Sequence, residues 1–277
     1  MSAHQHLEPD ACGAYRERGY HFPLRGLSAD EATSSREKFL AYWKVNEASL
    51  QALQPRARVA YLLDTHLFLR WVHDIVVDPR VLDAVESVLG PDILAWSSQW
   101  FVKLPRDSSY VSWHQDATYW GLTPPSVTTA WLALSPSTVQ NGCLRVIPGS
   151  HHGALLPQRE TYAASNMLSR GQEIAVEVDE SRAVDLVLSP GQFSLHHVGI
   201  IHGSSPNESA EPRIGLAVRY ISPDVVQHGA ARDLAVLARG HDPFGHFDLV
   251  VPPQRDLPYG TSELHAEALA RKRRNLA

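Results

Sequence analysis

Apolar positions recur with the spacing of an α-helix in the first third of the chain, most clearly over residues 78–89. Asp78 can accept hydrogen bonds from the free N–H groups of a first turn, Pro79 suits the first helical position, and Gly90 ends the pattern. The apolar face of this segment contains Leu82, Val85, Val88 and Leu89. Residues 29–44 are also rich in helix formers. The sequence therefore predicts a mainly helical N-terminal part, whose 78–89 helix packs on a sheet.

From Ile93 to Ile221 the pattern changes to short β-rich runs. They are separated by turn signals at Pro105, Pro124-Pro125, Asn141-Gly142, Pro148-Gly149, Pro190-Gly191 and Ser205-Pro206-Asn207. In the best strand, 213–221, apolar residues alternate with small residues and arginines, so that one face can pack and the other can present charge. Short strands at this spacing are typical of a double-sheet jelly roll. We predict an all-β core with flanking helices.

After Pro223 the pattern indicates loops and then a C-terminal helix. The helix carries the basic run Arg271-Lys272-Arg273-Arg274, which we interpret as a solvated helix end rather than a nucleic-acid patch. We expect one domain over residues 1–277. It would consist of a mainly helical N-terminal part (1–90), a jelly-roll core (91–221), and C-terminal loops with a helix (222–277).

Composition narrows the classes of function. The net charge of -5 and the pI near 6.3 argue against general nucleic-acid binding, because such proteins present a basic face. The sequence has no signal-peptide pattern and no run that approaches the roughly 20 apolar residues of a membrane span. Cys12 and Cys143 are too far apart to form a CxxC pair. We expect a cytoplasmic protein that binds a small-molecule substrate, without nucleic-acid or membrane partners; the sequence leaves its oligomeric state open.

A His-x-Asp pair is the first candidate for chemistry. Residues two apart in a strand point to the same face, so the imidazole of His114 and the carboxylate of Asp116 can reach one metal ion. With 15 His and 16 Asp in 277 residues, about one such pair is expected by chance, and His246 with Asp248 is a second copy. The context distinguishes the first pair, because a suitable third ligand follows it downstream.

His202 is that third candidate. It lies between an apolar run and a Gly-Ser-Ser-Pro-Asn turn, and Arg213 opens the next strand eleven residues later. Two imidazoles and one carboxylate form the facial set that holds Fe(II) and leaves positions open for other ligands. The planar guanidinium of Arg213 can clamp a carboxylate with two hydrogen bonds. These residues predict a non-haem iron(II) oxygenase that uses O2 and the dicarboxylate 2-oxoglutarate.

Three groups of residues resemble the phytanoyl-CoA dioxygenase-like branch of the iron(II)/2-oxoglutarate oxygenases. They are Trp113-His114-Gln115-Asp116, then Asn141-Gly142-Cys143-Leu144 with Ile147-Pro148-Gly149-Ser150-His151, and finally Ile201-His202-Gly203-Ser204 with Arg213. The resemblance covers roughly residues 60–221. It implies a double-stranded β-helix core (jelly roll, cupin-like). It also implies that His114, Asp116 and His202 bind the iron and that Arg213 pairs with the distal carboxylate of 2-oxoglutarate.

The resemblance also bears on the surroundings of the iron. It places Gln99 and Trp131 at co-substrate contacts, and we expect His66 and Trp120 to contact the substrate. Asp116 argues against halogenation, because the iron halogenases of this branch have a small residue in place of the ligand carboxylate. The family analogy favours hydroxylation of a small polar metabolite in antibiotic or other secondary metabolism. Ring closure or desaturation stays open, because the same ligands serve these reactions.

Two other functions stay open on the sequence. A redox-inert metal enzyme can hold Zn²⁺ with the same three ligands and a water molecule. Arg213 argues against a zinc enzyme, because a hydrolytic zinc site needs no arginine eleven residues after its last ligand. A non-catalytic jelly roll that binds a small molecule could lose a metal ligand without penalty, yet all three are present.

Overall fold

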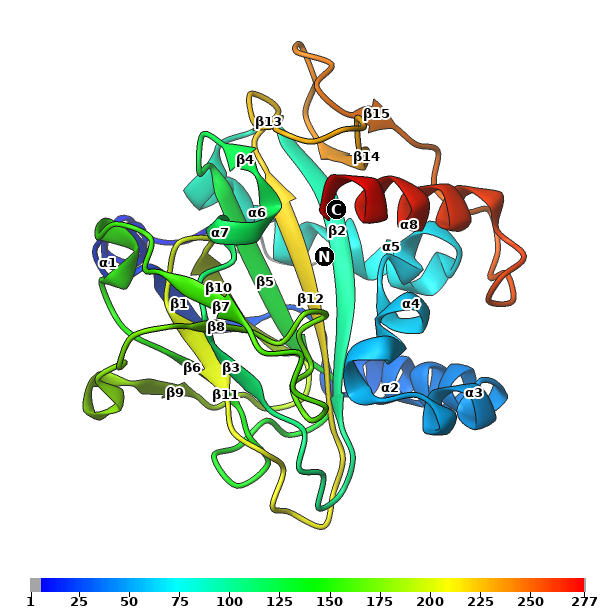
Figure 1. The fold of residues 1–277 in the computed structure, drawn as a ribbon. Coiled ribbons are helices and arrows are strands. Elements are labelled where there is room, and N and C mark those ends of the chain that lie inside the picture. Colours follow the sequence, from blue (N-terminus) through cyan, green and yellow to red (C-terminus); the bar gives the residue numbers. More distant parts are fainter. Residues whose placement is uncertain (1–5, 277) are drawn as a thin grey trace.

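The structure is a computed structural model that describes residues 6–276. Residues 1–5 and 277, which belong to the predicted domain, lie outside the described residues. Two sheets pack face to face, and helices cover the outer face of the larger one (Figure 1). This arrangement confirms the predicted all-β core with flanking helices, a jelly roll. Among the described helices, none is long and apolar enough to cross a bilayer.

The larger sheet has seven strands, in the order β1 (Tyr20–Arg25), β10 (Gln192–His197), β5 (Val127–Ala133), β12 (Arg213–Ile221), β2 (Ile93–Lys103), β14 (Leu234–Arg239) and β15 (Asp248–Leu249). The smaller sheet has four, in the order β3 (Val111–His114), β11 (His202–Ser204), β6 (Leu144–Val146) and β9 (Val184–Leu186). Two further pairs are β4 (Leu122–Thr123) with β13 (Val226–Gln227), and β7 (Gln158–Glu160) with β8 (Gln172–Ile174). All pairs are antiparallel except β14 with β15.

The α-helices are α1 (Pro9–Arg18), α2 (Ala29–Val45), α3 (Glu47–Ala52), α4 (Val59–Leu62), α5 (Arg70–Val76), α6 (Pro79–Leu89), α7 (Ala117–Trp120) and α8 (Glu263–Leu276). Short 3-10 turns are η1 (Pro55–Arg58), η2 (Thr65–Leu67), η3 (Ser150–His152) and η4 (Glu180–Arg182). The Asp78 carboxylate accepts the Arg80 N–H at the start of α6, and Gly90 follows its last residue. The predictions for 29–44 and 78–89 are thus confirmed.

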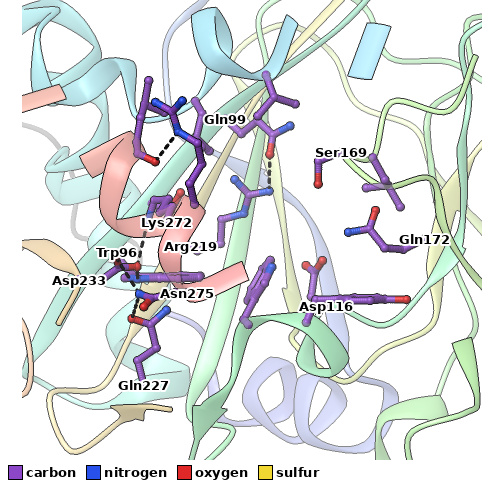
Figure 2. Close-up of a pocket in the computed structure, with 18 of the residues that line it drawn as sticks. Trp96, Gln99, Asp116, Ser169, Gln172, Arg219, Gln227, Asp233, Lys272 and Asn275 are labelled. Carbon is purple, nitrogen blue, oxygen red and sulfur yellow. Dashed lines mark hydrogen bonds and ion pairs between the residues drawn. The ribbon is translucent and has the colours of Figure 1, made fainter. Parts of the chain in front are cut away.

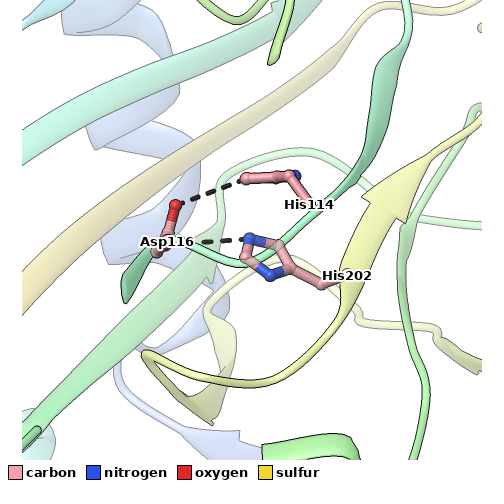
Figure 3. Close-up of side chains that lie close together, drawn as sticks. All are labelled: His114, Asp116 and His202. Atoms are coloured by element: carbon pink, nitrogen blue, oxygen red, sulfur yellow. Dashed lines mark ion pairs between the residues drawn. The ribbon is translucent and has the colours of Figure 1, made fainter. Parts of the chain in front are cut away.

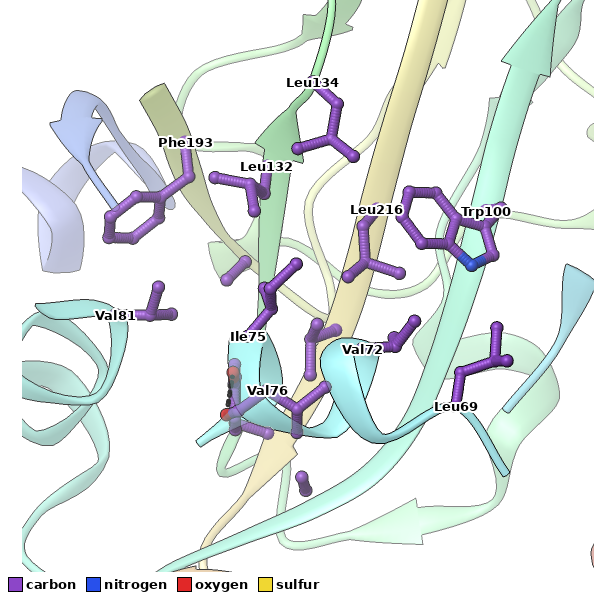
Figure 4. Close-up of a cluster of buried hydrophobic side chains, with 14 of the residues drawn as sticks. Leu69, Val72, Ile75, Val76, Val81, Trp100, Leu132, Leu134, Phe193 and Leu216 are labelled. Atoms are coloured by element: carbon purple, nitrogen blue, oxygen red, sulfur yellow. Dashed lines mark hydrogen bonds between the residues drawn. The ribbon is translucent and has the colours of Figure 1, made fainter. Parts of the chain in front are cut away.

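The main core lies between the helices and the outer face of the larger sheet (Figure 4). Val72, Ile75 and Val76 of α5 pack there with strand residues such as Leu132 and Leu216. Along β12 the apolar residues Ile214, Leu216, Val218 and Tyr220 belong to this core. The intervening Arg213, Ala217 and Arg219 line a cavity on the opposite face, between the two sheets. The period of two in 213–221 therefore positions the site, as the sequence predicted.

Four strands, β1, β13, β14 and β15, lie outside the segment in which we predicted the β-rich core. β1 is a short edge strand with Pro23 inside it, a residue that argues against a strand in sequence but is tolerated at an edge. β14 has the sequence LAVLAR, whose Ala and Leu residues also suit a helix. Its pairing with β2 and the short β15 complete that edge of the larger sheet. Tertiary pairing, rather than local propensity, makes these segments strands.

Candidate metal centre and adjoining cavities

His114, Asp116 and His202 converge between the sheets (Figure 3). His114 ends β3, His202 begins β11, and the two are register partners across this strand pair. Asp116 precedes α7 and turns its carboxylate toward both rings. Its oxygens lie 3.3 Å from His114 Nε2 and 3.8 Å from His202 Nε2. Among the described residues, this is the one group of three His, Cys, Asp or Glu side chains close enough to share an ion, and the second pair, His246 and Asp248, is not part of it.

The hydrogen bonds of the two imidazoles fit a metal centre. His114 Nδ1 lies 2.9 Å from the Ser112 carbonyl, and His202 Nδ1 lies 3.0 Å from the Ile200 carbonyl. A carbonyl only accepts, so each Nδ1 carries the hydrogen and each Nε2 presents its lone pair to the centre. Two imidazole nitrogens and one carboxylate form a facial donor set, which suits Fe(II) and leaves its other coordination positions open.

Burial and mutual charge shift the pKa values of Asp116 and His202. Burial lowers the pKa of His202 to about 4, and the neighbouring His114 adds to this. Burial alone would raise the pKa of Asp116, but its interactions with His202 and His114 outweigh that and hold it below the ordinary range. At neutral pH the centre therefore offers a carboxylate and a neutral His202 imidazole, the forms that bind metal.

A small cavity of about 50 Å³, here called the inner cavity, extends from the triad into the space between the sheets. Arg213, Trp131 and Ser204 line it beside His114, Asp116 and His202. Arg213 is buried, donates from Nη1 to the Gly142 carbonyl, and has no hydrogen-bond acceptor for Nε among the described residues. An orphaned guanidinium N–H beside a metal centre fits the carboxylate of a co-substrate.

Trp131 and Gly215 shape the wall around Arg213. The guanidinium carbon of Arg213 lies 5.2 Å from the centre of the Trp131 ring. A Cβ on Gly215 would lie 2.0 Å from a carbon of that ring. Glycine at position 215 therefore lets the indole lie against β12 and support the arginine.

A second cavity, here called the outer cavity, has a volume of about 340 Å³ and reaches from His114 and Asp116 to the C-terminal helix α8 (Figure 2). Its walls carry the aromatic side chains of Trp96, Tyr119 and Trp120. Arg219 lines both cavities, donates 3.1 Å to Gln99 Oε1, and lies 5.4 Å from the Trp120 ring. The outer cavity has room for a small molecule beside the metal centre.

Lys272 of α8 forms the far wall of the outer cavity with Asp233 and Trp96. Its ammonium is 3.4 Å from Asp233, 3.6 Å from the buried Asp64, and 4.4 Å from the centre of the Trp96 ring. With a side-chain exposure of 12%, Lys272 corrects our interpretation of the basic run as a solvated helix end. Arg273 and Arg274 are exposed as expected, but buried carboxylates draw Lys272 inward.

The structure distributes the other predicted contacts between the cavities. Trp131 lines the inner cavity and Trp120 the outer one, as a co-substrate and a substrate contact would. Gln99, predicted at the co-substrate, lines the outer cavity. His66 is buried against Ser98, with Nδ1 2.7 Å from the hydroxyl, and lies outside both linings. Geometry therefore gives no support to a substrate contact of His66.

Sequence reasoning missed four residues around the cavities. A sequence signal for two of them existed. Arg219 lies an even number of positions from Arg213 on β12, and Ser204 lies two positions from His202 on β11, so each shares a strand face with a predicted site residue. No sequence signal pointed to Lys103 of β2 or Lys272 of α8, because only strand pairing and helix docking bring these residues to the site.

Comparison with known proteins gives the family. The model of the phytanoyl-CoA dioxygenase (PhyH) family matches residues 5–215. The chain belongs to this family. A solved structure described as a non-heme monooxygenase, ThoJ in its apo form, is 35% identical, with a TM-score of 0.83 over 96% of this chain and 97% of that one.

Two curated relatives match a shorter region. A probable alpha-ketoglutarate-dependent hypophosphite dioxygenase of Stutzerimonas stutzeri is 30% identical over 57% of this chain and 56% of its own length. The peroxisomal phytanoyl-CoA dioxygenase of Homo sapiens is 31% identical over 53% of this chain and 44% of its own. The chain thus spans about half the length of the curated relatives it matches. At the level of the family, the predictions of a dioxygenase, Fe(II) and 2-oxoglutarate are confirmed.

Proposed function

We propose that this chain is an Fe(II)- and 2-oxoglutarate-dependent dioxygenase that oxidises a small polar metabolite in the outer cavity. The observation that carries this proposal is the inner cavity, which joins a facial triad at one end to the buried, incompletely bonded Arg213 at the other. A dicarboxylate keto acid needs both ends, whereas a hydrolytic zinc site needs only the metal.

The residues have distinct tasks in this reaction. His114, Asp116 and His202 would hold the iron, which supplies O2 activation coupled to the decarboxylation of 2-oxoglutarate and so the oxidation of a C–H bond. Arg213 would bind the distal carboxylate through its free N–H, with Trp131 against its face. Arg213 and Trp131 are both buried, which limits their contact with bulk water and strengthens these polar contacts.

The outer cavity limits the substrate by size and position. Its volume of about 340 Å³ suits a small molecule, and its lining brings that molecule beside His114 and Asp116. Trp120 forms part of the wall nearest the ligand pair, in keeping with a substrate contact. We propose hydroxylation as the outcome, with a setting in secondary metabolism such as antibiotic biosynthesis resting on family analogy.

Anaerobic titration of the Fe(II)-loaded protein with 2-oxoglutarate tests the proposal. We expect a weak visible charge-transfer band of the chelate in the wild type. The Arg213→Ala variant should need at least about 10-fold more keto acid, because a charge-assisted bidentate pair is lost. Arg239→Ala, which removes an arginine ion-paired with Asp83 outside both cavities, is the matched control and should titrate like wild type. Absence of the band in fully metallated wild type would move the function to a redox-inert metal site.

A further inference from the structure

A buried lysine amine lies beside Arg213. Lys103, the last residue of β2, is the register partner of Arg213 on β12, and its side chain is fully buried. Its Nζ donates to the Ser204 hydroxyl at 2.7 Å and to the Ser205 carbonyl. Strand pairing thus brings an amine and a guanidinium together beside the inner cavity, which Arg213 lines.

Neither the Lys103 amine nor the Arg213 guanidinium has an anionic partner among the described residues. Among the described residues, no carboxylate forms an ion pair with Lys103 or Arg213, and the hydrogen bonds of both side chains go only to neutral oxygens. Gly142 permits this crowding, since a Cβ there would lie 2.0 Å from the Ser205 carbonyl and 2.9 Å from Lys103 Nζ. Charging both groups at once is costly without an anion, so the pair fits a site that is completed by a ligand carboxylate.

Ser204 connects Lys103 to the cavity. Ser204 lines the inner cavity with Arg213, whereas Lys103 does not. Because the Ser204 oxygen already accepts a hydrogen bond from Lys103, the hydroxyl retains its own hydrogen to donate elsewhere. A carboxylate bound to Arg213 is the acceptor that this cavity would offer.

We propose that Lys103 is a positioning residue of the co-substrate site: it holds the Ser204 hydroxyl so that it donates, together with Arg213, to the distal carboxylate of 2-oxoglutarate, and it adds positive charge behind that carboxylate. The inference rests on the proposed function, since it concerns the same co-substrate. It explains why an amine is buried where no protein carboxylate balances it.

The electrostatics give this role a pH signature. Burial lowers the pKa of Lys103 to about 5, and Arg213 adds to this; Asp107 and Cys143 are the other charged or titratable groups that act on it, in the opposite direction. A carboxylate bound nearby favours the ammonium and raises that pKa. Binding of 2-oxoglutarate at pH 7.5 should therefore take up a proton at Lys103.

Two keto acids separate this role from a merely structural one. We would measure binding to Fe(II)-loaded protein, without O2, of 2-oxoglutarate and of 2-oxopentanoate, which lacks the distal carboxylate. Lys103→Met should weaken 2-oxoglutarate binding about 10- to 100-fold and leave 2-oxopentanoate within about 3-fold. Calorimetry in two buffers of different ionisation enthalpy should detect proton uptake with 2-oxoglutarate in wild type, and none in Lys103→Met.

Ser204→Ala provides a second variant should Lys103→Met fail to fold. Ser204→Ala should also weaken the binding of 2-oxoglutarate but not that of 2-oxopentanoate. The double variant should bind 2-oxoglutarate no more weakly than the single variant with the larger loss, because both changes remove the same interaction. Equal losses for both keto acids, or no change in either variant, would overturn the role of Lys103. A wild type that binds neither keto acid would instead refute the proposed function.

Discussion

The inner and outer cavities share the metal centre but differ in origin. The inner cavity is lined mostly by strand residues, nearly all within the segment that the family model matches, residues 5–215. The far wall of the outer cavity comes from residues beyond that segment, including Asp233 and Lys272. The inner cavity, where we propose that iron and co-substrate bind, thus lies almost wholly within the matched segment, whereas the far wall of the outer cavity also draws on the C-terminal region.

The difference extends to how each cavity is held together. Residues of the inner cavity are fixed by neighbouring strands, as His114 is by His202 and Arg213 by Lys103. The far wall of the outer cavity depends on α8, whose Lys272 is anchored by two buried carboxylates. Changes to the inner cavity should therefore act on metal and co-substrate, and changes to the far wall should act on helix docking and substrate.

The largest expected effect comes from the shared metal centre. Asp116→Ala removes the carboxylate that lies against both imidazoles, and we expect metal affinity to fall by about 100-fold or more and 2-oxoglutarate consumption to cease. Equilibrium dialysis with Fe(II) measures this. Asp248→Ala changes the other His-x-Asp pair and should bind Fe(II) like wild type. Equal losses in the two variants would contradict the assignment of the triad.

A change behind the inner cavity should come next. Gly215→Ala drives a methyl group into the Trp131 ring, so we expect a loss of roughly 1–3 kcal/mol in the free energy of unfolding and weaker binding of 2-oxoglutarate. Denaturant unfolding and the anaerobic titration measure the two effects. Gly13→Ala is the matched control, because nothing lies within 4 Å of its added methyl and Ala suits helix α1 better. An equal free energy of unfolding for Gly215→Ala and Gly13→Ala would contradict the close packing of Trp131 on β12.

Lys272→Met tests the far wall. The change leaves Asp64 and Asp233 buried without their cation, and we expect a loss of about 3 kcal/mol at neutral pH, with Fe(II) and 2-oxoglutarate affinity unchanged. Burial would raise the pKa of Asp64, but the Lys272 ammonium and other neighbours hold it below its ordinary value in the wild type. Such a group stabilises above its unfolded pKa, about 3.9, and loses that contribution as pH falls.

The lowered pKa of Asp64 predicts how the effect of Lys272→Met varies with pH. The difference in unfolding free energy between wild type and Lys272→Met should be largest at neutral pH and should shrink as the pH falls toward 4 and below. Denaturant unfolding at several pH values measures it. Asp64→Asn in the Lys272→Met background should recover part of the loss, since it removes one unbalanced charge. A difference that does not vary with pH would mean that Lys272 stabilises α8 only by packing.

The sequence predicted the chemistry of the inner cavity better than the shape of the outer one. Ligand identity depended on local spacing: His114 and Asp116 on the two-residue period, and Arg213 on its distance from His202. Lys272 could not be found in this way, because its burial depends on Asp64 and Asp233 from distant segments. A basic run at a helix end is usually solvated, and only the docked structure shows which of its members turns inward.

The edges of the larger sheet could not be predicted for a related reason. β12 is central, and its alternation is strong because one face packs on the apolar core while the other carries Arg213 and Arg219 toward the cavities. β1 contains Pro23, and β14 is composed of residues that also suit a helix. Both segments become strands through pairing with β10 and β2, which local sequence does not reveal.

The smallest expected effect concerns Gln99, on which sequence and structure differ. Family resemblance placed it at the co-substrate, whereas the structure places it in the outer cavity, where its Oε1 accepts from Arg219. On the geometry, Gln99→Leu should change the 2-oxoglutarate dissociation constant by less than about 3-fold, because Arg219 also lies against Trp120 and Phe101. The titration used for Arg213→Ala measures this. A loss as large as that of Arg213→Ala would assign Gln99 to the co-substrate and would show that the two cavities act as one.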